Sequence, residues 1–507
     1  MSPNAILRGV CHWMALTVAT ASIAWASSAA AQSPVVAVTG GAIAGHATDG
    51  ATEFLAIPYA APPVGTLRWR APAPVLPWAG QRDASRSGPA CLQNDEGWNH
   101  AQWLDASEDC LTLDVRTPSM TGKRPVVVWI HGGSNRAGSG RDAVNSGFVG
   151  KGLVVVSIQY RLGVLGFLSH PALAAEQGGA SGNYGLMDQI AALRWVRDNI
   201  ARFGGDPAQV TIMGESAGAQ DVSLLLAAPD ARGLFRAAVL QSGTPGFGMS
   251  FRSHADAMKI GEALDRLAGA QGDLTRLRRL SPVALFALQS QLSETESHGS
   301  DFVFLRTTID GRVLPESPDR LLAKRPAVPV IIGTNTVEFG PGAGSVPLDA
   351  FAQYWFGAGA TAALGAYRDE EARGADPRRG NVELRMQSDA QFHCPANRMA
   401  ALLTARGWPV WRYEFDVGPT GGLTSHAAEI GYIFGGRPVG GGVSVLDYWS
   451  ALALHGDPNA AIDSTPTRPA WPSLAQGSER TLRFGGQSTE VAKGLPRAAF
   501  CSFASNL

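Results

Sequence analysis

The segment 210–219 constrains the fold of this chain more than any other. Residues 210–213 are mostly β-branched or apolar and predict a strand, and Gly214 follows directly. Ser216 comes two positions later, before Gly218 and a run of small residues that can begin a helix. A strand, a tight turn around a serine and a helix form a nucleophile elbow. The segment therefore predicts that the Ser216 hydroxyl stands at the carboxyl end of a parallel strand.

A serine hydroxyl becomes an effective nucleophile only beside a base, and the base needs a carboxylate to orient it. In enzymes with this elbow, the acid and then the histidine follow the serine along the chain. The histidines that follow Ser216 are His254, His298, His393, His426 and His455.

Glu338 is the candidate acid. It follows an apolar run at 328–332 that predicts a buried strand, and turn-forming residues surround it. Catalytic groups often lie on loops just past strand ends, whereas most glutamates are simply solvated. Both interpretations of Glu338 fit this position.

With Glu338 as the acid, three histidines remain as the base. His393 lies beside Cys394 and fits a packing role, and His455 lies in a turn-rich segment. His426 lies in a loop after a glycine-rich stretch, where a strand end would present a catalytic group. Spacing alone leaves all three open.

The third expected element is a site for a developing negative charge. Residues 124–130 predict a central strand that runs into His131, Gly132, Gly133 and Ser134. Amide groups of such a glycine-rich loop, with the amide after the nucleophile, form the oxyanion hole of lipases and esterases.

In this order, the motifs resemble those of type-B carboxylesterases, the α/β-hydrolase family that includes the cholinesterases. The shared motifs lie at 68–69, 107–111, 131–133, 160–163, 182–189, 203–207, 214–218, 241–243, 309–311, 333–335, 426–429 and 456–459. The resemblance implies one α/β-hydrolase domain over 32–507, with a mostly parallel central sheet and helices on both faces. Helical segments at 253–269 and 282–292 are expected to cap the site.

The resemblance also implies the roles of the site residues. The triad is expected to be Ser216, Glu338 and His426, and the oxyanion donors are the amides of Gly133, Ser134 and Ala217. Ser242 matches a serine that helps to hold the histidine region. Buried ion pairs are expected between Arg161 and Asp188 and between Arg68 and Glu108.

The chain departs from the family pattern at three of these places. The family has a third glycine where this chain has Ser134, whose Cβ narrows the hole and whose hydroxyl either donates or points away. The family also has aspartate before the acid and glycine after it, where this chain has Val337 and Phe339. Glu215, next to the nucleophile, is either a site residue or the variable position of the elbow.

The resemblance also bears on the substrate. Cholinesterases hold a quaternary ammonium over a tryptophan that lies in the loop between their first two cysteines. In this chain Trp98 is the nearest match, and Trp103 is the other candidate. We interpret both tryptophans instead as residues that pack the disulfide loop or line the wall of an apolar pocket. We therefore expect a broad carboxylesterase that prefers neutral esters over choline esters.

Cysteine usage fits an oxidising compartment. Cys11 lies in the predicted signal peptide, and the remaining four cysteines allow three pairings. The resemblance implies Cys91–Cys110 and Cys394–Cys501. No Cys-x-x-Cys and no histidine pair at ligand spacing occurs, so we expect no metal and no cofactor.

The N-terminus predicts export. Arg8, an apolar stretch at 13–25 and an Ala-x-Ala site ending at Ala31 are typical of a signal peptide at 1–31. We expect a periplasmic or secreted protein without membrane insertion after cleavage. The net charge of −1 gives no basic face for nucleic acid.

The sequence thus predicts a serine carboxylesterase that hydrolyses a small-molecule ester to an acid and an alcohol. The alternatives are a lactonase, an amidase or a detoxifying hydrolase on the same site, and a non-catalytic, cholinesterase-like binding protein. Because the triad residues are all present, the binding protein is the weaker alternative. The oligomeric state is not readable from the sequence.

Overall fold

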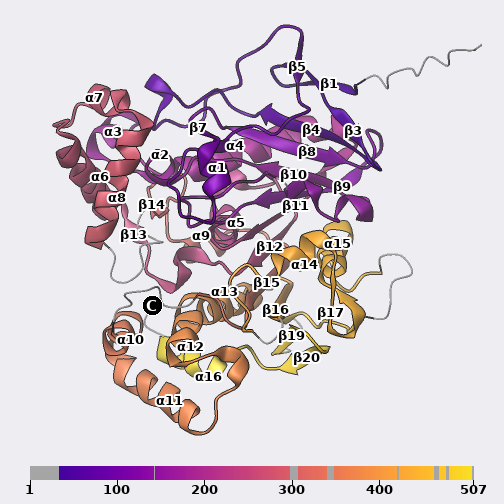
Figure 1. The fold of residues 1–507 in the computed structure, drawn as a ribbon, viewed down its shortest axis with the longest axis vertical. Helices are drawn as coiled ribbons and strands as arrows, with labels where there is room; N and C mark the ends of the chain where they lie inside the picture. Colours follow the sequence, from indigo (N-terminus) through magenta and orange to yellow (C-terminus); the bar gives the residue numbers. More distant parts are fainter. Residues whose placement is uncertain are drawn as a thin grey trace, which may run out of the picture. The chain divides into compact units, whose positions relative to one another are not determined.

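A twisted sheet of eleven strands runs through the described part of the chain (Figure 1). Its order is β20-β19-β16-β15-β12-β11-β9-β10-β8-β4-β3. The central strands, from β19 to β10, pair in parallel, and the strands at both edges pair antiparallel. The strands are β3 (His46–Thr48), β4 (Ala51–Pro58), β8 (Thr112–Thr117), β9 (Arg124–Ile130), β10 (Val154–Ile158), β11 (Gly205–Glu215), β12 (Ala237–Gln241), β15 (Val330–Asn335), β16 (Val410–Asp416), β19 (Arg480–Gly485) and β20 (Thr489–Lys493).

The structure is a computed structural model. It describes residues 33–141, 143–296, 306–339, 347–419, 422–461, 468–474 and 479–504. The predicted signal peptide, 1–31, lies outside the described residues. Residues 34–507 form one unit by their internal contacts.

Alternate residues of the central strands face two separate cores, because successive side chains of a strand point to opposite faces. On β9, Val126, Val128 and Ile130 pack into one core, whereas Val127 and Trp129 pack into the other. These strands are buried on both faces, which explains their nearly continuous apolar sequence.

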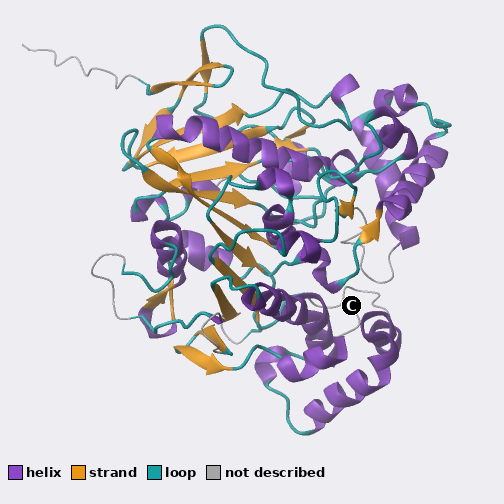
Figure 2. Cartoon of the chain, turned by 180° about the vertical axis from the view of Figure 1, so that it is seen from behind, coloured by secondary structure: helices purple, strands orange, loops and turns teal. Residues whose placement is uncertain are grey.

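Helices cover both faces of this sheet (Figure 2). The first core contains side chains of α4 (Tyr184–Asn199), α5 (Ala217–Ala227) and α13 (Cys394–Ala405). The second contains side chains of α14 (Ile430–Gly435) and α15 (Val445–His455). The strand order and the two helical layers give the α/β arrangement that the sequence predicts.

Further helices extend the two layers: α6 (His254–Ala268), α7 (Leu274–Arg279) and α8 (Pro282–Glu296) add side chains to the first core, and others form a third cluster. The predicted helices at 253–269 and 282–292 are present as α6 and α8, with α7 between them. Helices α10 (Leu348–Phe356), α11 (Ala360–Ala372) and α12 (Val382–Ser388) share a third apolar cluster with the C-terminal α16 (Ala498–Cys501). Among the described residues, no helix has the length and apolar character needed to cross a bilayer.

Smaller elements complete the described chain. The shorter helices are α1 (His100–Leu104), α2 (Gly163–Phe167), α3 (Pro171–Glu176) and α9 (Pro318–Leu322). The strands outside the main sheet are β1 (Val35–Val38), β2 (Gly41–Ala44), β5 (Gln81–Asp83), β6 (Ala90–Cys91), β7 (Ala106–Ser107), β13 (Arg252–Ser253), β14 (Thr308–Ile309), β17 (Pro438–Val439) and β18 (Val443–Ser444).

Candidate active site

Ser216 occupies the turn between β11 and α5. Its φ of 56° and ψ of −125° are values that residues other than glycine rarely adopt. The flanking glycines explain how the turn closes. A Cβ on Gly218 would lie 2.1 Å from the carbonyl oxygen of Ile130, and a Cβ on Gly214 would lie 2.5 Å from the Gly218 carbonyl carbon. The elbow therefore requires glycine at both positions.

Backbone hydrogen bonds fix the elbow to the neighbouring strand. The Ser216 amide donates to the carbonyl of Gln241 over 2.8 Å, and the Ser216 carbonyl accepts from the Gln220 amide over 2.9 Å. Gly243 packs so closely that a Cβ there would lie 2.1 Å from the Ser216 carbonyl oxygen. The serine is thus held rigidly, and only 4% of its surface is exposed.

Glu338 follows β15, and hydrogen bonds hold its carboxylate from several sides. Oε1 accepts from the Asn335 amide and the Ser242 hydroxyl, each over 2.7 Å. Oε2 lies 2.7 Å from Nδ1 of His426. The Glu338 amide donates to the Ser388 hydroxyl over 3.1 Å. This carboxylate is buried and in place to fix the tautomer of the imidazole.

His426 faces a carboxylate at each ring nitrogen. Besides the Glu338 contact at Nδ1, its Nε2 lies 3.0 Å from Oε1 of Glu215, the residue directly before Ser216. These two atoms are close enough for an ion pair but are not aligned for a hydrogen bond. Burial alone lowers the pKa of His426, but Glu215 and Glu338 outweigh burial and raise that pKa to about 10.

Two phenylalanines flank the His426 ring. The ring centroid of Phe339 lies 4.1 Å from that of the imidazole, and Phe392 lies at 5.1 Å. Phe247 continues this aromatic row beyond Phe392, at 5.7 Å. Phe339 stands where the family has glycine, so the departure noted in the sequence places an aromatic face on the base. Sequence reasoning identified the substitution but not this contact.

A third carboxylate, Glu429, lies behind the acid. Its oxygens accept from the side-chain amides of Gln241, over 3.3 Å, and Asn335, over 2.8 Å. Burial, together with the charges of Glu215 and Glu338, raises the pKa of Glu429 to about 7. The sequence analysis assigned no role to this residue, although it is the last residue of the shared motif at 426–429, three positions after the histidine.

The loop after β9 adjoins the elbow. A Cβ on Gly132 would lie 3.0 Å from the Cβ of Ser216, so this glycine permits the close approach. Gly133 has a φ of 100° and Ser134 a φ of 60°. Ala217, the first residue of α5, follows the nucleophile directly. The structure thus places the loop that carries two of the expected oxyanion donors against the nucleophile.

Trp98 lies over this loop. A Cβ on Gly133 would lie 3.2 Å from Cη2 of Trp98, and 64% of the tryptophan surface is exposed. Trp103 lies on the same disulfide loop and packs instead against His100, with ring centroids 5.5 Å apart. Of the two candidates, Trp98 is the one in contact with the oxyanion loop.

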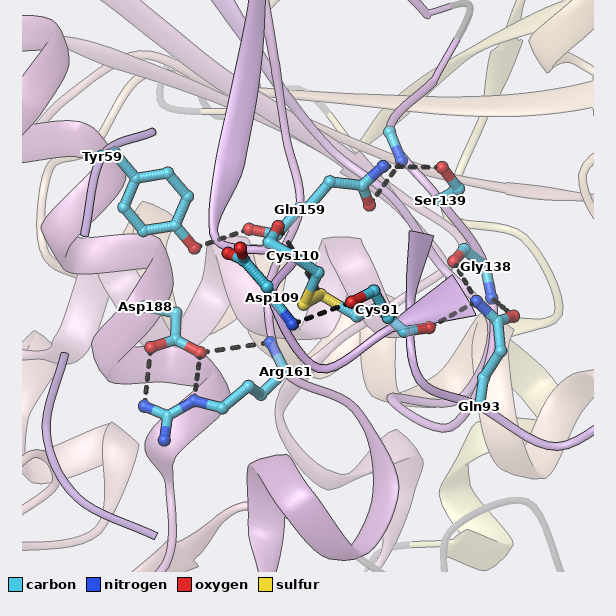
Figure 3. Close-up of a disulfide and its surroundings, with 12 residues drawn as sticks. Tyr59, Cys91, Gln93, Asp109, Cys110, Gly138, Ser139, Gln159, Arg161 and Asp188 are labelled. Carbon is cyan, nitrogen blue, oxygen red and sulfur yellow. Dashed lines mark hydrogen bonds and ion pairs between the residues drawn. A yellow bond between two sulfur atoms is a disulfide. The ribbon is translucent and has the colours of Figure 1, made fainter. Parts of the chain in front are cut away.

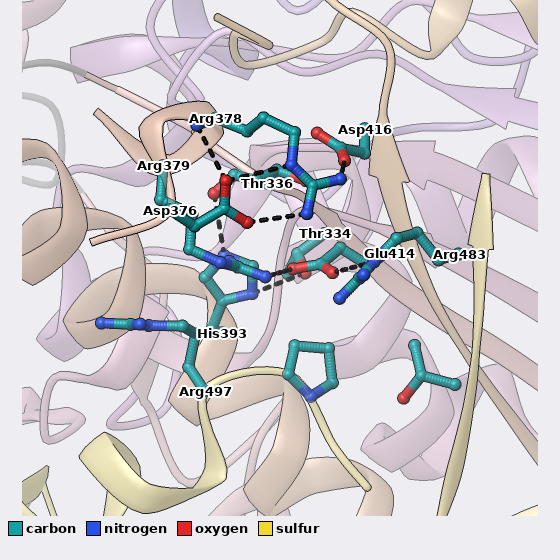
Figure 4. Close-up of polar contacts among 12 residues, drawn as sticks. Thr334, Thr336, Asp376, Arg378, Arg379, His393, Glu414, Asp416, Arg483 and Arg497 are labelled. Atoms are coloured by element: carbon teal, nitrogen blue, oxygen red, sulfur yellow. Dashed lines mark hydrogen bonds and ion pairs between the residues drawn. The ribbon is translucent and has the colours of Figure 1, made fainter. Parts of the chain in front are cut away.

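Two of the three candidate bases are placed elsewhere. His393 is buried, with Nδ1 3.0 Å from the Thr334 hydroxyl and Nε2 3.3 Å from the Thr336 carbonyl (Figure 4). Burial lowers its pKa to about 3, so it stays neutral within a network of arginines and carboxylates. His455 is the last residue of α15. Only His426 contacts Glu338 among these three.

Both disulfides that the resemblance implied are present. Cys91 and Cys110 are joined across 1.98 Å, and Cys394 and Cys501 across 2.03 Å. The first, which Figure 3 shows, closes the loop of residues 91–110, and Trp98 belongs to that segment. A disulfide stabilises a fold mainly by restricting the unfolded chain, typically by ~2–4 kcal/mol.

Both expected ion pairs are also present. Arg161 contacts Asp188 through Nε and Nη2, each over 2.7 Å (Figure 3). Arg68 contacts Glu108 through Nε over 2.5 Å and Nη2 over 2.7 Å. Both are bidentate and hydrogen-bonded, which is the condition under which buried charges are tolerated.

The groups around Ser216 suit nucleophilic acyl transfer. Within the described ranges, no group of three or more histidine, cysteine, aspartate or glutamate side chains is arranged to hold a metal ion. A serine, an oriented imidazole and a glycine-rich amide loop are the groups that nucleophilic acyl transfer uses.

Comparison with known proteins gives concordant matches. The carboxylesterase family matches residues 32–504. The chain is 34% identical to fumonisin B1 esterase of Sphingopyxis macrogoltabida, covering 87% of this chain and 86% of that protein. It is 34% identical to para-nitrobenzyl esterase of Bacillus subtilis, covering 79% and 83%. A solved structure of PNB esterase superimposes with a TM-score of 0.81 at 28% identity, covering 93% of this chain and 99% of that one.

Proposed function

The chain belongs to the carboxylesterase family and is a carboxylic ester hydrolase with the α/β-hydrolase fold. We propose that it is an exported serine esterase. Ser216 is the nucleophile, His426 the base and Glu338 the acid of its triad. The observation that carries this assignment is the 2.7 Å contact between Glu338 and Nδ1 of His426, whose other nitrogen is directed at the residue before Ser216.

The first step forms an acyl-enzyme. His426 accepts the Ser216 proton at Nε2 while the serine oxygen attacks the ester carbonyl. The amides of Gly133, Ser134 and Ala217 donate to the oxyanion. The intermediate collapses when the imidazolium protonates the departing alcohol, which regenerates the neutral base.

The second step releases the acid. Water takes the place of the alcohol, gives its proton to His426 and attacks the acyl carbonyl. The same amides stabilise the second oxyanion, and the imidazolium returns its proton to Ser216. The products are a carboxylic acid and an alcohol, and no cofactor takes part.

Glu215 sets the starting state of this cycle. In the structure, Nε2 of His426 faces Glu215. A raised pKa favours the imidazolium, which suits the charge that forms in the transition state but disfavours the neutral base at the outset. We infer that the histidine exchanges the Glu215 contact for the Ser216 hydroxyl when substrate binds.

The proposed export rests on two features. The signal sequence at 1–31 ends in an Ala-x-Ala site, and all four remaining cysteines are paired. Non-reducing mass spectrometry of protein from the periplasm and the medium should find both disulfides and a mature N-terminus at Gln32. Four free thiols, or an intact N-terminus, would refute export.

The substrate class is a neutral ester. Trp98 is an exposed apolar surface beside the oxyanion loop, and aromatic side chains flank the base. Relatives named for fumonisin B1 and for para-nitrobenzyl esters indicate that this scaffold accepts ester groups of different size. We therefore propose broad acyl and alcohol tolerance.

The test is a hydrolysis panel combined with active-site labelling. p-Nitrophenyl esters of increasing acyl length, larger esters, lactones and anilides would be compared for kcat/KM. A fluorophosphonate should label Ser216, and Ser216→Ala should abolish both labelling and turnover. Ser253→Ala, at the N-cap of α6, is the control and should keep the wild-type kcat/KM and labelling even where loss of the cap lowers the stability of the helix. Labelling at another residue would refute the assignment.

A further inference from the structure

Two consecutive residues of the oxyanion loop have left-handed backbone conformations although neither is glycine. Ser134 has a φ of 60° and Asn135 a φ of 56°. Left-handed conformations disfavour side chains by roughly 1–2 kcal/mol per residue, less for asparagine. Such strain persists only where surrounding contacts determine the conformation. Contacts with neighbouring residues must therefore fix the conformation of this loop.

Asn135 supplies them. Only 1% of its surface is exposed, and its backbone carbonyl accepts from the Gly163 amide over 2.6 Å. Its side-chain Oδ1 accepts from the Tyr160 hydroxyl over 3.2 Å. Its Nδ2 donates to Oδ1 of Asp221 over 3.1 Å. The backbone and both ends of the side chain are therefore anchored.

Asp221, the carboxylate that anchors Asn135, is buried and accepts from neutral amide groups. No surface of Asp221 is exposed, and within the described residues it takes part in no ion pair. Its other oxygen accepts from Gln189 Nε2 over 2.6 Å. Burial raises its pKa to about 7. An unpaired buried carboxylate is destabilising, so its presence here calls for a specific role.

The position of Asp221 indicates that role. It lies on α5, the helix that begins directly after Ser216 and carries Ala217 at its first position. Asn135 directly follows Ser134, one of the two expected donors from the loop. The 3.1 Å contact therefore ties the helix of the nucleophile to the loop of the oxyanion donors.

We propose that Asp221 is a positioning residue that, through Asn135, holds the oxyanion loop in register with Ser216. In this chain the link compensates for Ser134, which replaces the third glycine of the family. Glycine adopts the left-handed conformation without strain, whereas serine needs the loop to be held. This inference rests on the proposed function, because it presumes that Ser216 forms the oxyanion.

The first test is Asp221→Leu. Leucine is of similar size but accepts no hydrogen bond, so the link to Asn135 is lost, whereas Asp221→Asn would keep it if the Gln189 amide rotated and presented its unpartnered Oε1. Loss of a whole oxyanion donor typically lowers kcat ~100–1,000-fold, and a misplaced donor lowers it less. We expect kcat for p-nitrophenyl butyrate to fall ~10–100-fold, with KM within about threefold of the wild type.

A transition-state analogue separates positioning from general damage. An aryl trifluoromethyl ketone forms a tetrahedral adduct with the serine and presents an oxyanion to the hole. In Asp221→Leu its Ki should rise by the same factor as kcat falls. Asp310→Leu is the matched control, since Asp310 is a buried carboxylate that accepts from the amides of Arg312 and Leu314. That control should leave both values unchanged even where it lowers the melting temperature.

The decisive test is rescue by glycine. If the link compensates for Ser134, then Ser134→Gly combined with Asp221→Leu should recover kcat and Ki to within about threefold of Ser134→Gly alone. Should Asp221→Leu not fold, Asn135→Ala breaks the same link with a smaller side chain and should show the same rescue. Equal losses with and without Ser134→Gly, or a loss carried by KM alone, would overturn the proposal. Fluorophosphonate labelling of Ser216 in each variant keeps this outcome separate from a failure of the proposed mechanism.

Discussion

Two regions meet at Ser216, and they are held in different ways. On the acid–base side, the Glu338 carboxylate accepts three contacts of 2.7 Å, and His426 donates its own amide to the Glu338 carbonyl. On the oxyanion side, the loop passes through two strained residues and is tied to Asp221, which forms no ion pair within the described residues. The Glu338 carboxylate is held by several hydrogen bonds, whereas the oxyanion loop has a strained backbone.

This difference reflects how the amino-acid sequence determines each kind of site. A triad depends on the identity of a few side chains, so changing one of them removes the function. An oxyanion hole depends on the backbone conformation of its loop, and all the residues that contact the loop together determine that conformation. Losses on the acid–base side should therefore be large and local, and losses on the oxyanion side graded and open to compensation.

The largest effect is expected on the acid–base side. Ser216→Ala and His426→Ala should each lower kcat by roughly 10⁴-fold or more, and the double variant should be little worse, because the two residues act as one unit. The measurement is burst and steady-state kinetics with p-nitrophenyl acetate. His455→Ala, at the end of α15, is the control. A variant at Ser216 that retained a tenth of the activity would contradict the mechanism.

Much of the fold and of the acid–base side follows from the sequence. Apolar runs predict the central strands because these strands are buried on both faces. The strand predicted at 328–332 begins instead at Val330, since Pro329 has no amide to donate to the ladder. The elbow is predictable because only glycine fits at positions 214 and 218, two residues before and after Ser216.

The oxyanion side is far less predictable. The sequence shows that Ser134 replaces a glycine, but the residue that holds the loop, Asp221, lies 87 positions further along the chain and carries no motif. The contacts of Glu215 and Phe339 with His426 also depend on packing between distant segments. Such contacts follow from tertiary structure and leave no local periodicity or spacing.

The second prediction concerns Glu215, where the two sides come closest. Glu215 helps to raise the pKa of His426 to about 10, so kcat/KM of the wild type should keep rising above pH 7 as the free histidine loses its proton. Glu215→Gln removes one negative charge, so the rising limb should move at least one pH unit toward acid. Activity at pH 6 should then rise about tenfold relative to the maximum.

The stability of the same variant provides an independent check. A histidine whose pKa is higher in the folded state contributes stability below its unfolded pKa of 6.5, and this contribution is lost as pH rises toward 10. Urea unfolding should therefore show a steeper loss of stability over that range in the wild type than in Glu215→Gln. Identical pH profiles in rate and stability would mean that the ion pair is absent in solution.

The third prediction concerns Trp98 and the choice of substrate. A cation over an exposed aromatic ring gains ~0.5–1 kcal/mol, which corresponds to a two- to fivefold preference. Because 64% of Trp98 is exposed, this gain is small, and a neutral thioester of equal size should match or exceed butyrylthiocholine in kcat/KM. A choline preference above about tenfold that Trp98→Ala abolished would show a cholinesterase-like site instead.

The smallest effect is expected at Ser134, where substitutions distinguish a hydroxyl donor from a backbone amide donor on the oxyanion side. If its Cβ only crowds the oxyanion loop, Ser134→Gly should leave kcat for p-nitrophenyl acetate unchanged or raise it up to about threefold, since the Asp221 link already holds the loop. If its hydroxyl donates to the oxyanion, the same change should slow turnover by ~100-fold at unchanged KM. Ser134→Ala separates the two cases, because it removes the hydroxyl and keeps the Cβ. Equal activity in Ser134→Ala and the wild type would assign the donor to the backbone amide, and would leave the left-handed backbone as the feature that this loop must maintain.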